Sequence, residues 1–198
     1  VCNNIPKKIN KNVTYIKSSN LRSVLAIISR NFYDNPSSKL KLIGVTGTNG
    51  KTSVVSLLHQ LFSNLGHNCG LISTIENIVV DQKIKSTHTT PDPKQLNILL
   101  NEMVSKNCGY CFMEVSSHAV DQQRIFGLNF DIAVFTNISH DHLDYHENFE
   151  NYLNAKKIFF DDLNENSIAL VNKDDIRSDY ILQNTKALSK TFSLKSYS

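Results

Sequence analysis

The stretch Leu42-Ile-Gly-Val-Thr-Gly-Thr-Asn-Gly-Lys-Thr52 decides the fold that this sequence predicts. Its first half is an apolar run typical of a buried strand, and its second half, Gly47 to Thr52, is rich in glycine. A helical pattern follows and ends at Gly66, with apolar side chains at Val54, Leu57, Leu58, Leu61 and Leu65. A strand, a glycine-rich loop and a helix in this order predict a phosphate-binding unit of an α/β protein.

The loop has the chemistry that phosphate binding needs. Glycines let backbone N–H groups approach phosphate oxygens, the helix N-terminus adds partial positive charge, Lys51 can pair with phosphate and Thr52 can ligate magnesium. A chance strand-to-helix turn is the alternative, and the flanking strand and helix disfavour it. A standard Walker loop has glycine at the place of Val45, whereas this chain has Gly44 and Gly47.

The rest of the chain alternates strands and helices, which predicts an α/β fold with a mostly parallel sheet flanked by helices. We expect further strands at 69–73, 110–115, 131–136 and 167–171, and helices at 93–106, 148–163 and 174–183. A small hairpin is expected at 76–86, turning at Asp81-Gln82. Residues 1–39 should form a leader with one helix, capped by Ser19 or Asn20, whose apolar face carries Leu21, Val24, Leu25 and Ile28.

Composition narrows the class of protein. The 198 residues, 40% hydrophobic and 20% charged, can bury one sizeable core. The net charge of +3 comes from scattered basic residues, so no stripe predicts nucleic-acid binding. No apolar run approaches the roughly 20 residues of a membrane span and no signal peptide is recognisable, so we expect a cytoplasmic protein. Cys108-Gly-Tyr-Cys111 could be a redox or zinc motif, but no second pair accompanies it and a buried strand cysteine is favoured.

Two further segments carry polar side chains directly after expected strands. Glu114 begins Glu114-Val-Ser-Ser-His118 at a strand's carboxyl end, where ligands bind in open α/β sheets, and it is a candidate magnesium ligand. A lone acidic residue there is more often structural, but the phosphate loop in the same sheet favours the ligand. The second segment, Thr136 to His146, contains three histidines and two aspartates that suggest a metal or phosphate site: His140, Asp141, His142, Asp144 and His146.

Alternatives to that second site remain open. The pattern His140-x-His142-x-Asp144 is also found in binuclear zinc hydrolases, but their next histidine directly follows the aspartate, whereas Tyr145 intervenes here. Such hydrolases need no phosphate loop. A purely structural histidine cluster is a third possibility. Further on, Tyr152-Leu-Asn-Ala-Lys156-Lys157 would by itself be an ordinary solvated helix face.

Four motifs in order resemble the central domain of MurE-type Mur ligases: Gly47-Thr-Asn-Gly-Lys-Thr52, Thr89-Thr-Pro91, Glu114-Val-Ser-Ser-His118 and Asp141-His-Leu-Asp-Tyr-His146. The resemblance spans nearly the whole chain. Folylpolyglutamate synthases, which are sister enzymes, typically have Gly-Lys-Gly-Ser in the loop. The resemblance implies an ATP- and Mg²⁺-dependent ligase that adds meso-diaminopimelate or L-lysine to UDP-N-acetylmuramoyl-L-alanyl-D-glutamate through an acyl phosphate.

The resemblance also implies residue roles. ATP would be held by Gly47, Thr48, Asn49, Gly50, Lys51 and Thr52, with Asn137 close to the nucleotide. The metal sites would use Thr52, Glu114, His142 and Lys156, the last as a carbamate. The catalytic group would be Lys51, Glu114, His142 and Lys156. The acceptor would contact Thr89, Thr90, Ser116, Gln122 and Arg124, of which Arg124 suits a carboxylate or phosphate. His140 is a departure, since many relatives have arginine there.

The same resemblance implies a domain arrangement. Residues 1–39 would be the tail of an N-terminal UDP-binding domain with its linker, and 40–198 an incomplete central ATP-binding domain without the C-terminal domain that selects the amino acid. The expected protein is a monomer that binds neither nucleic acid nor membrane. Two alternatives are a sister ligase such as folylpolyglutamate synthase and a non-catalytic nucleotide-binding fragment.

Overall fold

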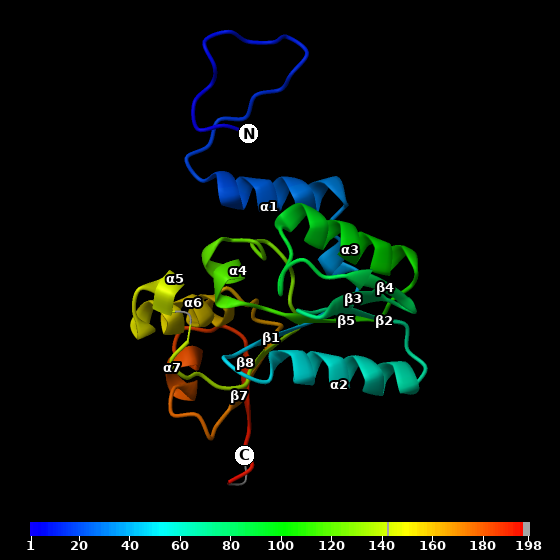
Figure 1. Ribbon diagram of the computed structural model, residues 1–198, viewed down its shortest axis with the longest axis vertical. Coiled ribbons are helices and arrows are strands. Elements are labelled where there is room, and N and C mark those ends of the chain that lie inside the picture. Colours follow the sequence, from blue (N-terminus) through cyan, green and yellow to red (C-terminus); the bar gives the residue numbers. More distant parts are fainter. Residues whose placement is uncertain (142, 196–198) are drawn as a thin grey trace.

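The computed structural model describes residues 1–141 and 143–195 (Figure 1). Its centre is an eight-stranded sheet in the order β4-β3-β2-β5-β1-β6-β7-β8. The pairs from β2 to β8 are parallel, and only β3 and β4 run antiparallel to their neighbours. The strands are β1 (Lys41–Thr46), β2 (Cys69–Ile72), β3 (Glu76–Val79), β4 (Gln82–Lys85), β5 (Tyr110–Glu114), β6 (Ile132–Phe135), β7 (Ile168–Asn172) and β8 (Leu188–Phe192). The predicted mostly parallel α/β fold is therefore confirmed.

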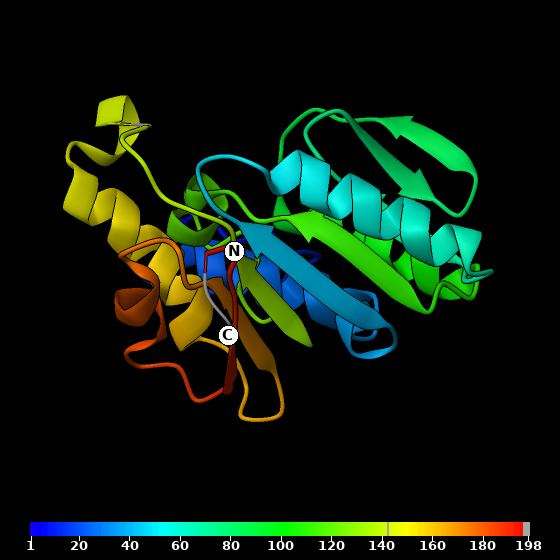
Figure 2. The ribbon, with the colours of Figure 1, turned by 90° about the horizontal axis from the view of Figure 1, so that it is seen from below.

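Helices cover both faces of this sheet (Figure 2). They are α1 (Leu21–Phe32), α2 (Lys51–Asn64), α3 (Pro93–Ser105), α4 (Ser117–Asp121), α5 (Leu143–His146), α6 (Phe149–Asp161) and α7 (Ser178–Leu182), with a 3-10 turn at Pro36–Ser38. Asn20, one of the two expected caps, accepts a bond from the Ser23 amide at 3.2 Å and so begins α1. The α7 helix is shorter than the expected 174–183.

The alternation of side chains along the strands produces a core on each face. On one face Val55 of α2 packs over Val45, Leu71 and Phe112. On the other face Leu96 and Leu100 of α3 and Phe160 of α6 pack in the larger cluster. Every residue of β1 after Lys41 is buried, as a central parallel strand covered on both faces requires.

The register of the parallel strands brings the polar segments to one edge. Val45 lies beside Glu114 of β5, and Thr46 lies beside Phe135 of β6. The loop that follows β1, the end of β5 and the segment that follows β6 therefore lie next to each other at the carboxyl ends of the strands. This is the edge at which ligands bind in open α/β sheets.

The apolar pattern of α2 overstates how much of this helix is buried. Leu57, Leu61 and Leu65 remain 64%, 52% and 65% exposed, because a helix lying on a sheet can turn only one narrow face inward. The buried and half-buried face carries Val54, Val55, Leu58 and Phe62. A similar correction applies to α1, where Leu25 and Ile28 are exposed while Ala26 and Ser29 are buried.

The hairpin turns one residue earlier than expected. Val79 pairs with Gln82, so Val80 and Asp81 form the turn, and Val80 has a left-handed φ of 58°. The cysteine prediction is confirmed, since Cys108 and Cys111 are both buried and free. Burial raises the pKa of the Cys111 thiol far above its usual value. Cys111 is therefore a core residue and carries no thiolate chemistry.

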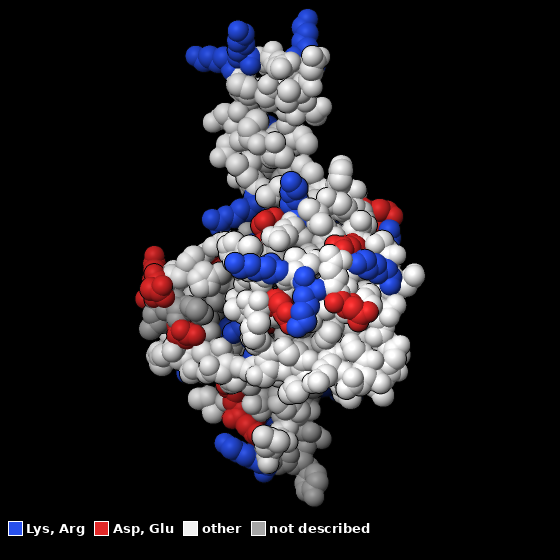
Figure 3. Space-filling view, turned by 45° about the vertical axis from the view of Figure 1, so that its right-hand side comes forward, with Lys and Arg blue, Asp and Glu red and all other residues white. Residues whose placement is uncertain are grey.

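The amino-terminal segment stands away from the sheet (Figure 1). Residues 1–20 form an extended excursion closed by a bridge between Cys2 and Lys17, and α1 then packs along α3. The assignment of residues 1–39 to a preceding domain stays a prediction. Lysine side chains gather at the tip of this segment, whereas basic and acidic side chains are interspersed over the rest of the visible face (Figure 3).

No helix within residues 1–141 and 143–195 is long and apolar enough to cross a membrane.

The turn between α5 and α6 offers a stability prediction. Glu147 is exposed and has a φ of 66°, a left-handed conformation that disfavours any residue with a Cβ atom. Replacing Glu147 with glycine should therefore stabilise the fold by about 0.5 to 1 kcal/mol despite glycine's greater unfolded-state entropy. Urea unfolding followed by circular dichroism measures the change. A Glu150→Gly variant, in the first turn of α6, should lower stability instead, and equal effects of both substitutions would contradict the argument.

Candidate nucleotide and metal site

The glycine-rich loop joins the end of β1 to the start of α2. Gly47 has a φ of 152° and Gly50 a φ of 86°, so both use conformations that favour glycine. The helices α1, α3 and α6 each have a side-chain cap at the N-terminus, whereas the N-cap residue of α2 is Gly50, which has no side chain. The first-turn amides of α2 and its dipole therefore point at the space above the loop, as an anion site requires.

The segment after β6 holds this loop in shape. The Thr136 hydroxyl donates to the Asn49 carbonyl at 2.7 Å, and the Asn49 amide donates to Asn137 Oδ1 at 3.0 Å. Asn137 Nδ2 donates back to the Asn49 carbonyl at 3.1 Å. Asn137 therefore clamps the backbone of the glycine-rich loop, while its expected place close to the nucleotide stays a prediction.

Gly44, the first glycine of the unusual loop spacing, is explained by side-chain packing on β1 and not by phosphate binding. A Cβ atom on Gly44 would lie 2.6 Å from Phe159 Cζ and 2.7 Å from Phe130 Cε1. Gly44 is therefore required by the aromatic rings that pack on β1, and it takes no part in the phosphate loop itself. Gly47 is the glycine of close approach, because its Cβ would meet Thr136 Oγ1 at 1.9 Å.

Two lysine side chains converge on one backbone oxygen of the loop. Lys51 Nζ donates to the Gly47 carbonyl at 2.8 Å and to the Thr48 carbonyl at 2.9 Å, and Lys156 Nζ donates to the same Gly47 oxygen at 3.1 Å. Lys156 also lies 4.5 Å above the Tyr152 ring. Burial lowers the pKa of Lys51, although Glu114 and Asp141 oppose the shift. Burial and then Lys51 lower the pKa of Lys156 to about 7.

The lowered pKa of Lys156 predicts how stability depends on pH. The unfolded lysine has a pKa of 10.5, so between about pH 7 and 10.5 the unfolded chain binds more protons than the folded chain. Stability should therefore rise with pH in this window. Lys156→Met removes the free-energy cost of deprotonating or burying this lysine on folding. The variant should therefore be more stable than the parent at pH 7 by on the order of 3 kcal/mol, with the gain shrinking toward pH 10.

Thermal unfolding of the parent and the variant at several pH values measures this difference. Lys157→Met is the matched control, because Lys157 is also buried but pairs with Asp161 at 2.7 Å. The control should lower stability at pH 7. A gain from Lys156→Met that stays constant from pH 6 to 10 would show that Lys156 is not the titrating group.

Oxygen donors gather beside the lysines. Glu114 is 1% exposed at the end of β5, and its Oε1 accepts from the Thr52 hydroxyl at 2.8 Å. Thr74, after β2, donates its amide to Oε1 at 2.8 Å and its hydroxyl to Oε2 at 3.1 Å. A carboxylate and hydroxyls are hard oxygen ligands of the kind that Mg²⁺ prefers, so this donor set fits magnesium.

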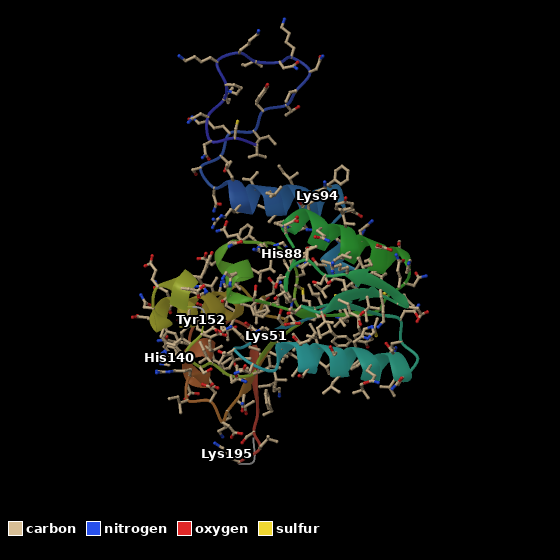
Figure 4. All side chains as sticks on the ribbon, viewed as in Figure 1. Lys51, His88, Lys94, His140, Tyr152 and Lys195 are labelled. Carbon is tan, nitrogen blue, oxygen red and sulfur yellow. The ribbon has the colours of Figure 1, made fainter. Side chains whose placement is uncertain are left out.

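A cavity of about 350 Å³ joins these groups to the expected acceptor residues. Thr90 is buried and donates to the Glu114 carbonyl at 2.8 Å, and Arg124 NH1 donates to the Thr90 carbonyl at 2.8 Å. Lys51 and Tyr152 lie toward the centre of the molecule, with His88 above them in the loop before α3 (Figure 4). The cavity lining is Lys51, Thr52, Thr74, His88, Thr89, Thr90, Glu114, Ser116, Ser117, His118, Arg124, Tyr152 and Lys156. Gln122 is not one of these lining residues, but it accepts hydrogen bonds from Arg124, which is.

None of the described residues of the histidine-rich segment, 136–141 and 143–146, lines the cavity. His142 lies outside the described residues. His140 is exposed and its ring packs near Phe149 at 4.8 Å, while His146 is buried and shares a hydrogen bond with the Ser117 hydroxyl at 2.9 Å. Within residues 1–141 and 143–195, no three His, Cys, Asp or Glu side chains group as a metal site.

Sequence patterns did not indicate several residues that build the site. Thr74 binds both oxygens of Glu114, and the buried Tyr152 hydroxyl lies 3.1 Å from Thr48 Oγ1. Threonine in a loop has no distinctive spacing. The interpretation of 152–157 as a solvated helix face is wrong, since Tyr152, Lys156 and Lys157 are all buried. The only available signal was the position of Thr74 just after a buried strand that neighbours β5.

A larger cavity, of about 1080 Å³, lies at the opposite edge of the sheet. Its lining includes Lys41 and Asp131, which form an ion pair with each other at 2.7 Å. Lys41 begins β1 and Asp131 directly precedes β6, so this cavity lies at the amino ends of the strands. The sequence motifs, the N-terminus of α2 and the buried Glu114 and Lys156 lie at the other edge, so the smaller cavity is the candidate site.

A parallel sheet whose central strand ends in a glycine-rich loop, followed by lysine and threonine at a helix N-terminus, defines a P-loop α/β domain. The model of the Mur ligase middle domain matches residues 45–198. The chain belongs to the Mur ligase middle-domain family.

Relatives and solved structures agree with this assignment and confirm the resemblance to MurE-type ligases. The chain is 53% identical over 195 residues to a UDP-N-acetylmuramoyl-L-alanyl-D-glutamate--2,6-diaminopimelate ligase of Cytophaga hutchinsonii, covering 98% of this chain and 40% of that protein. A solved structure of a ligase with the same name is 29% identical, with a TM-score of 0.75 over 89% of this chain and 37% of that chain. Folylpolyglutamate synthase of Mycobacterium tuberculosis, at 13% identity and a TM-score of 0.63 over 85% of this chain and 46% of that chain, shares the fold. The chain spans about 40% of the length of its curated relatives.

Proposed function

We propose that this chain supplies the nucleotide site and part of the acceptor site of an ATP-dependent ligase in the cytoplasm. The acceptor would be UDP-N-acetylmuramoyl-L-alanyl-D-glutamate, and the added amino acid would be 2,6-diaminopimelate. The observation that carries the proposal is a single cavity lined by a phosphate-loop lysine, a buried carboxylate and an arginine: Lys51, Glu114 and Arg124. The relatives named for the diaminopimelate reaction support this amino acid over L-lysine.

ATP would supply the phosphoryl group that activates the acceptor carboxylate, and magnesium would stabilise the negative charge of the phosphate oxygens. The residues of this chain would bind ATP and the metal ion and would neutralise the charge of the phosphate groups. Lys51 and the first-turn amides of α2 would bind phosphate oxygens, while Thr52 and Glu114 would hold the metal. Arg124 would orient an acceptor carboxylate or phosphate. Thr89, Thr90, Ser116 and Gln122 would complete the acceptor contacts.

Lys156 has the properties that carbamate formation requires. It is 1% exposed, and its pKa of about 7 leaves a substantial fraction of neutral amine near neutral pH. A neutral amine can capture carbon dioxide, and the resulting anion would be a second metal ligand beside Glu114. His142 stays a proposed ligand on the resemblance alone.

Titration calorimetry with separate ligands tests the proposal. The folded chain should bind a non-hydrolysable ATP analogue with Mg²⁺, and it should bind UDP-N-acetylmuramoyl-L-alanyl-D-glutamate but not a pteroate. An Arg124→Ala variant should lose acceptor binding while retaining the nucleotide. Binding of the pteroate in place of the UDP-linked acceptor would favour the folylpolyglutamate alternative. Binding of the nucleotide alone would favour the non-catalytic module.

A further inference from the structure

Arg124 belongs to a chain of hydrogen bonds that begins outside the cavity. Its Nε and NH2 groups donate to Gln122 Oε1 at 3.0 and 2.6 Å. Gln122 Nε2 donates in turn to the Tyr145 hydroxyl at 3.0 Å, and that hydroxyl donates to Asp121 Oδ2 at 2.6 Å. The chain thus joins the α5 helix, which follows the β6 strand and its polar segment, to the arginine of the acceptor site.

The direction of every hydrogen bond in this series is determined by the groups at its two ends, Arg124 and Asp121. A guanidinium has only donors, so Gln122 must turn its carbonyl oxygen to Arg124 and its amide nitrogen to Tyr145. A carboxylate only accepts, so the single proton of Tyr145 must go to Asp121 and the hydroxyl oxygen must accept from Gln122. No other arrangement satisfies all four side chains. Tyr145 therefore supplies the acceptor that stabilises the orientation of the Gln122 amide that Arg124 requires.

The backbone and the ring of Tyr145 support the same arrangement. Gln123 has a left-handed φ of 57°, and the Arg124 amide donates to the Ala119 carbonyl at 2.8 Å, which turns Arg124 back toward Thr90. The Tyr145 ring packs against His118 with centroids 4.0 Å apart. The half-buried guanidinium is consequently held on two sides, by the Thr90 carbonyl and by the Gln122 amide.

We propose that Tyr145 is a positioning residue for Arg124, acting through Gln122, and that it links the segment after β6 to the acceptor site. The consequence for acceptor binding rests on the proposed function, whereas the positioning itself does not. Because Tyr145→Phe keeps the ring contact with His118 and removes only the hydroxyl, it should release the Gln122 amide and loosen Arg124 without unfolding the chain.

The first measurement is hydrogen exchange of the Arg124 Nε–H group by nuclear magnetic resonance on the whole chain. Exchange should be at least about fivefold faster in Tyr145→Phe than in the parent. Tyr180→Phe is the matched control, because Tyr180 also donates a hydrogen bond, to Asn154 at 2.6 Å, but lies on α7 away from this chain of bonds. Unchanged exchange in Tyr145→Phe would overturn the proposal.

The second measurement is a double-mutant cycle on the affinity for UDP-N-acetylmuramoyl-L-alanyl-D-glutamate. Tyr145→Phe should weaken acceptor binding about tenfold in the parent but have little effect when Gln122 is already alanine, with nucleotide affinity unchanged in both. Equal effects in the two backgrounds would mean that Tyr145 does not act through Gln122. If exchange at Arg124 responds as expected but the parent binds no acceptor, the positioning role stands and the proposed function fails.

Discussion

Replacing Lys51 with alanine is expected to weaken binding of a non-hydrolysable ATP analogue with Mg²⁺ by about 100-fold or more. Lys51 is the cation nearest the loop backbone, with Nζ within 2.8 to 2.9 Å of two loop carbonyls. A charge-assisted contact to phosphate in a partly buried site contributes on the order of 3 kcal/mol, which corresponds to this loss of affinity. Titration calorimetry of the parent and the variant measures the change.

Lys94→Ala is the control for this experiment, because Lys94 is an exposed lysine on α3, away from the loop (Figure 4). It should bind the nucleotide as the parent does. Circular dichroism should show both variants folded, since Lys51 supports no residue of the core. Equal affinities of the parent and Lys51→Ala would mean that the nucleotide binds elsewhere or that Gly47 to Thr52 is only a structural turn.

Gly47→Ala should damage the same loop by a steric route. The new Cβ would lie 1.9 Å from Thr136 Oγ1 and 3.0 Å from the Asn137 backbone oxygen, at a φ of 152° that alanine rarely adopts. Thr136 cannot turn away freely, because its hydroxyl holds the Asn49 carbonyl at 2.7 Å. We expect a loss of about 2 to 3 kcal/mol in stability and at least about 30-fold weaker nucleotide binding.

Gly50→Ala separates the two causes of this effect. Gly50 also has a positive φ, of 86°, but nothing lies within 4 Å of the position that its Cβ would take. The variant should therefore show only the conformational cost, about 1 kcal/mol. Denaturant unfolding and calorimetry of both variants test the comparison. If Gly50→Ala is as damaging as Gly47→Ala, the clash with Thr136 is not the cause.

The sequence was sufficient to predict the architecture because the strands and long helices have strong local patterns. The apolar run from Leu42 to Thr46 and the loop after it were enough to predict the central strand. Similar apolar runs predicted each of the other parallel strands except β8. The short elements α4, α5 and β8 were missed. Helices of five and four residues are too short to show a period, and β8 is an exposed edge strand without an apolar face.

The candidate site was predictable only where motifs exist. Lys51, Thr52, Glu114 and Arg124 were each predicted, and the structure brings them to one cavity. The residues that hold these side chains in place were not predicted. Thr74 and Tyr145 come from segments that are distant in sequence from the groups they contact. Tyr145 was inside a quoted motif, yet its partners Asp121 and Gln122 lie 24 and 23 positions earlier. Such contacts depend on how the strands are ordered in the sheet.

The two outer strands of the described sheet, β4 and β8, have a bearing on how this chain behaves at high concentration. An edge strand offers unpaired backbone groups to any other strand, and lysine side chains are a common protection against such pairing. Both edges carry lysines, at Lys83 and Lys85 in β4 and at Lys190 in β8, where all five residues are exposed. We therefore expect acetylation of these lysines, which removes their charge, to promote self-association into extended sheets, an aggregation risk that does not depend on the residues of the cavity.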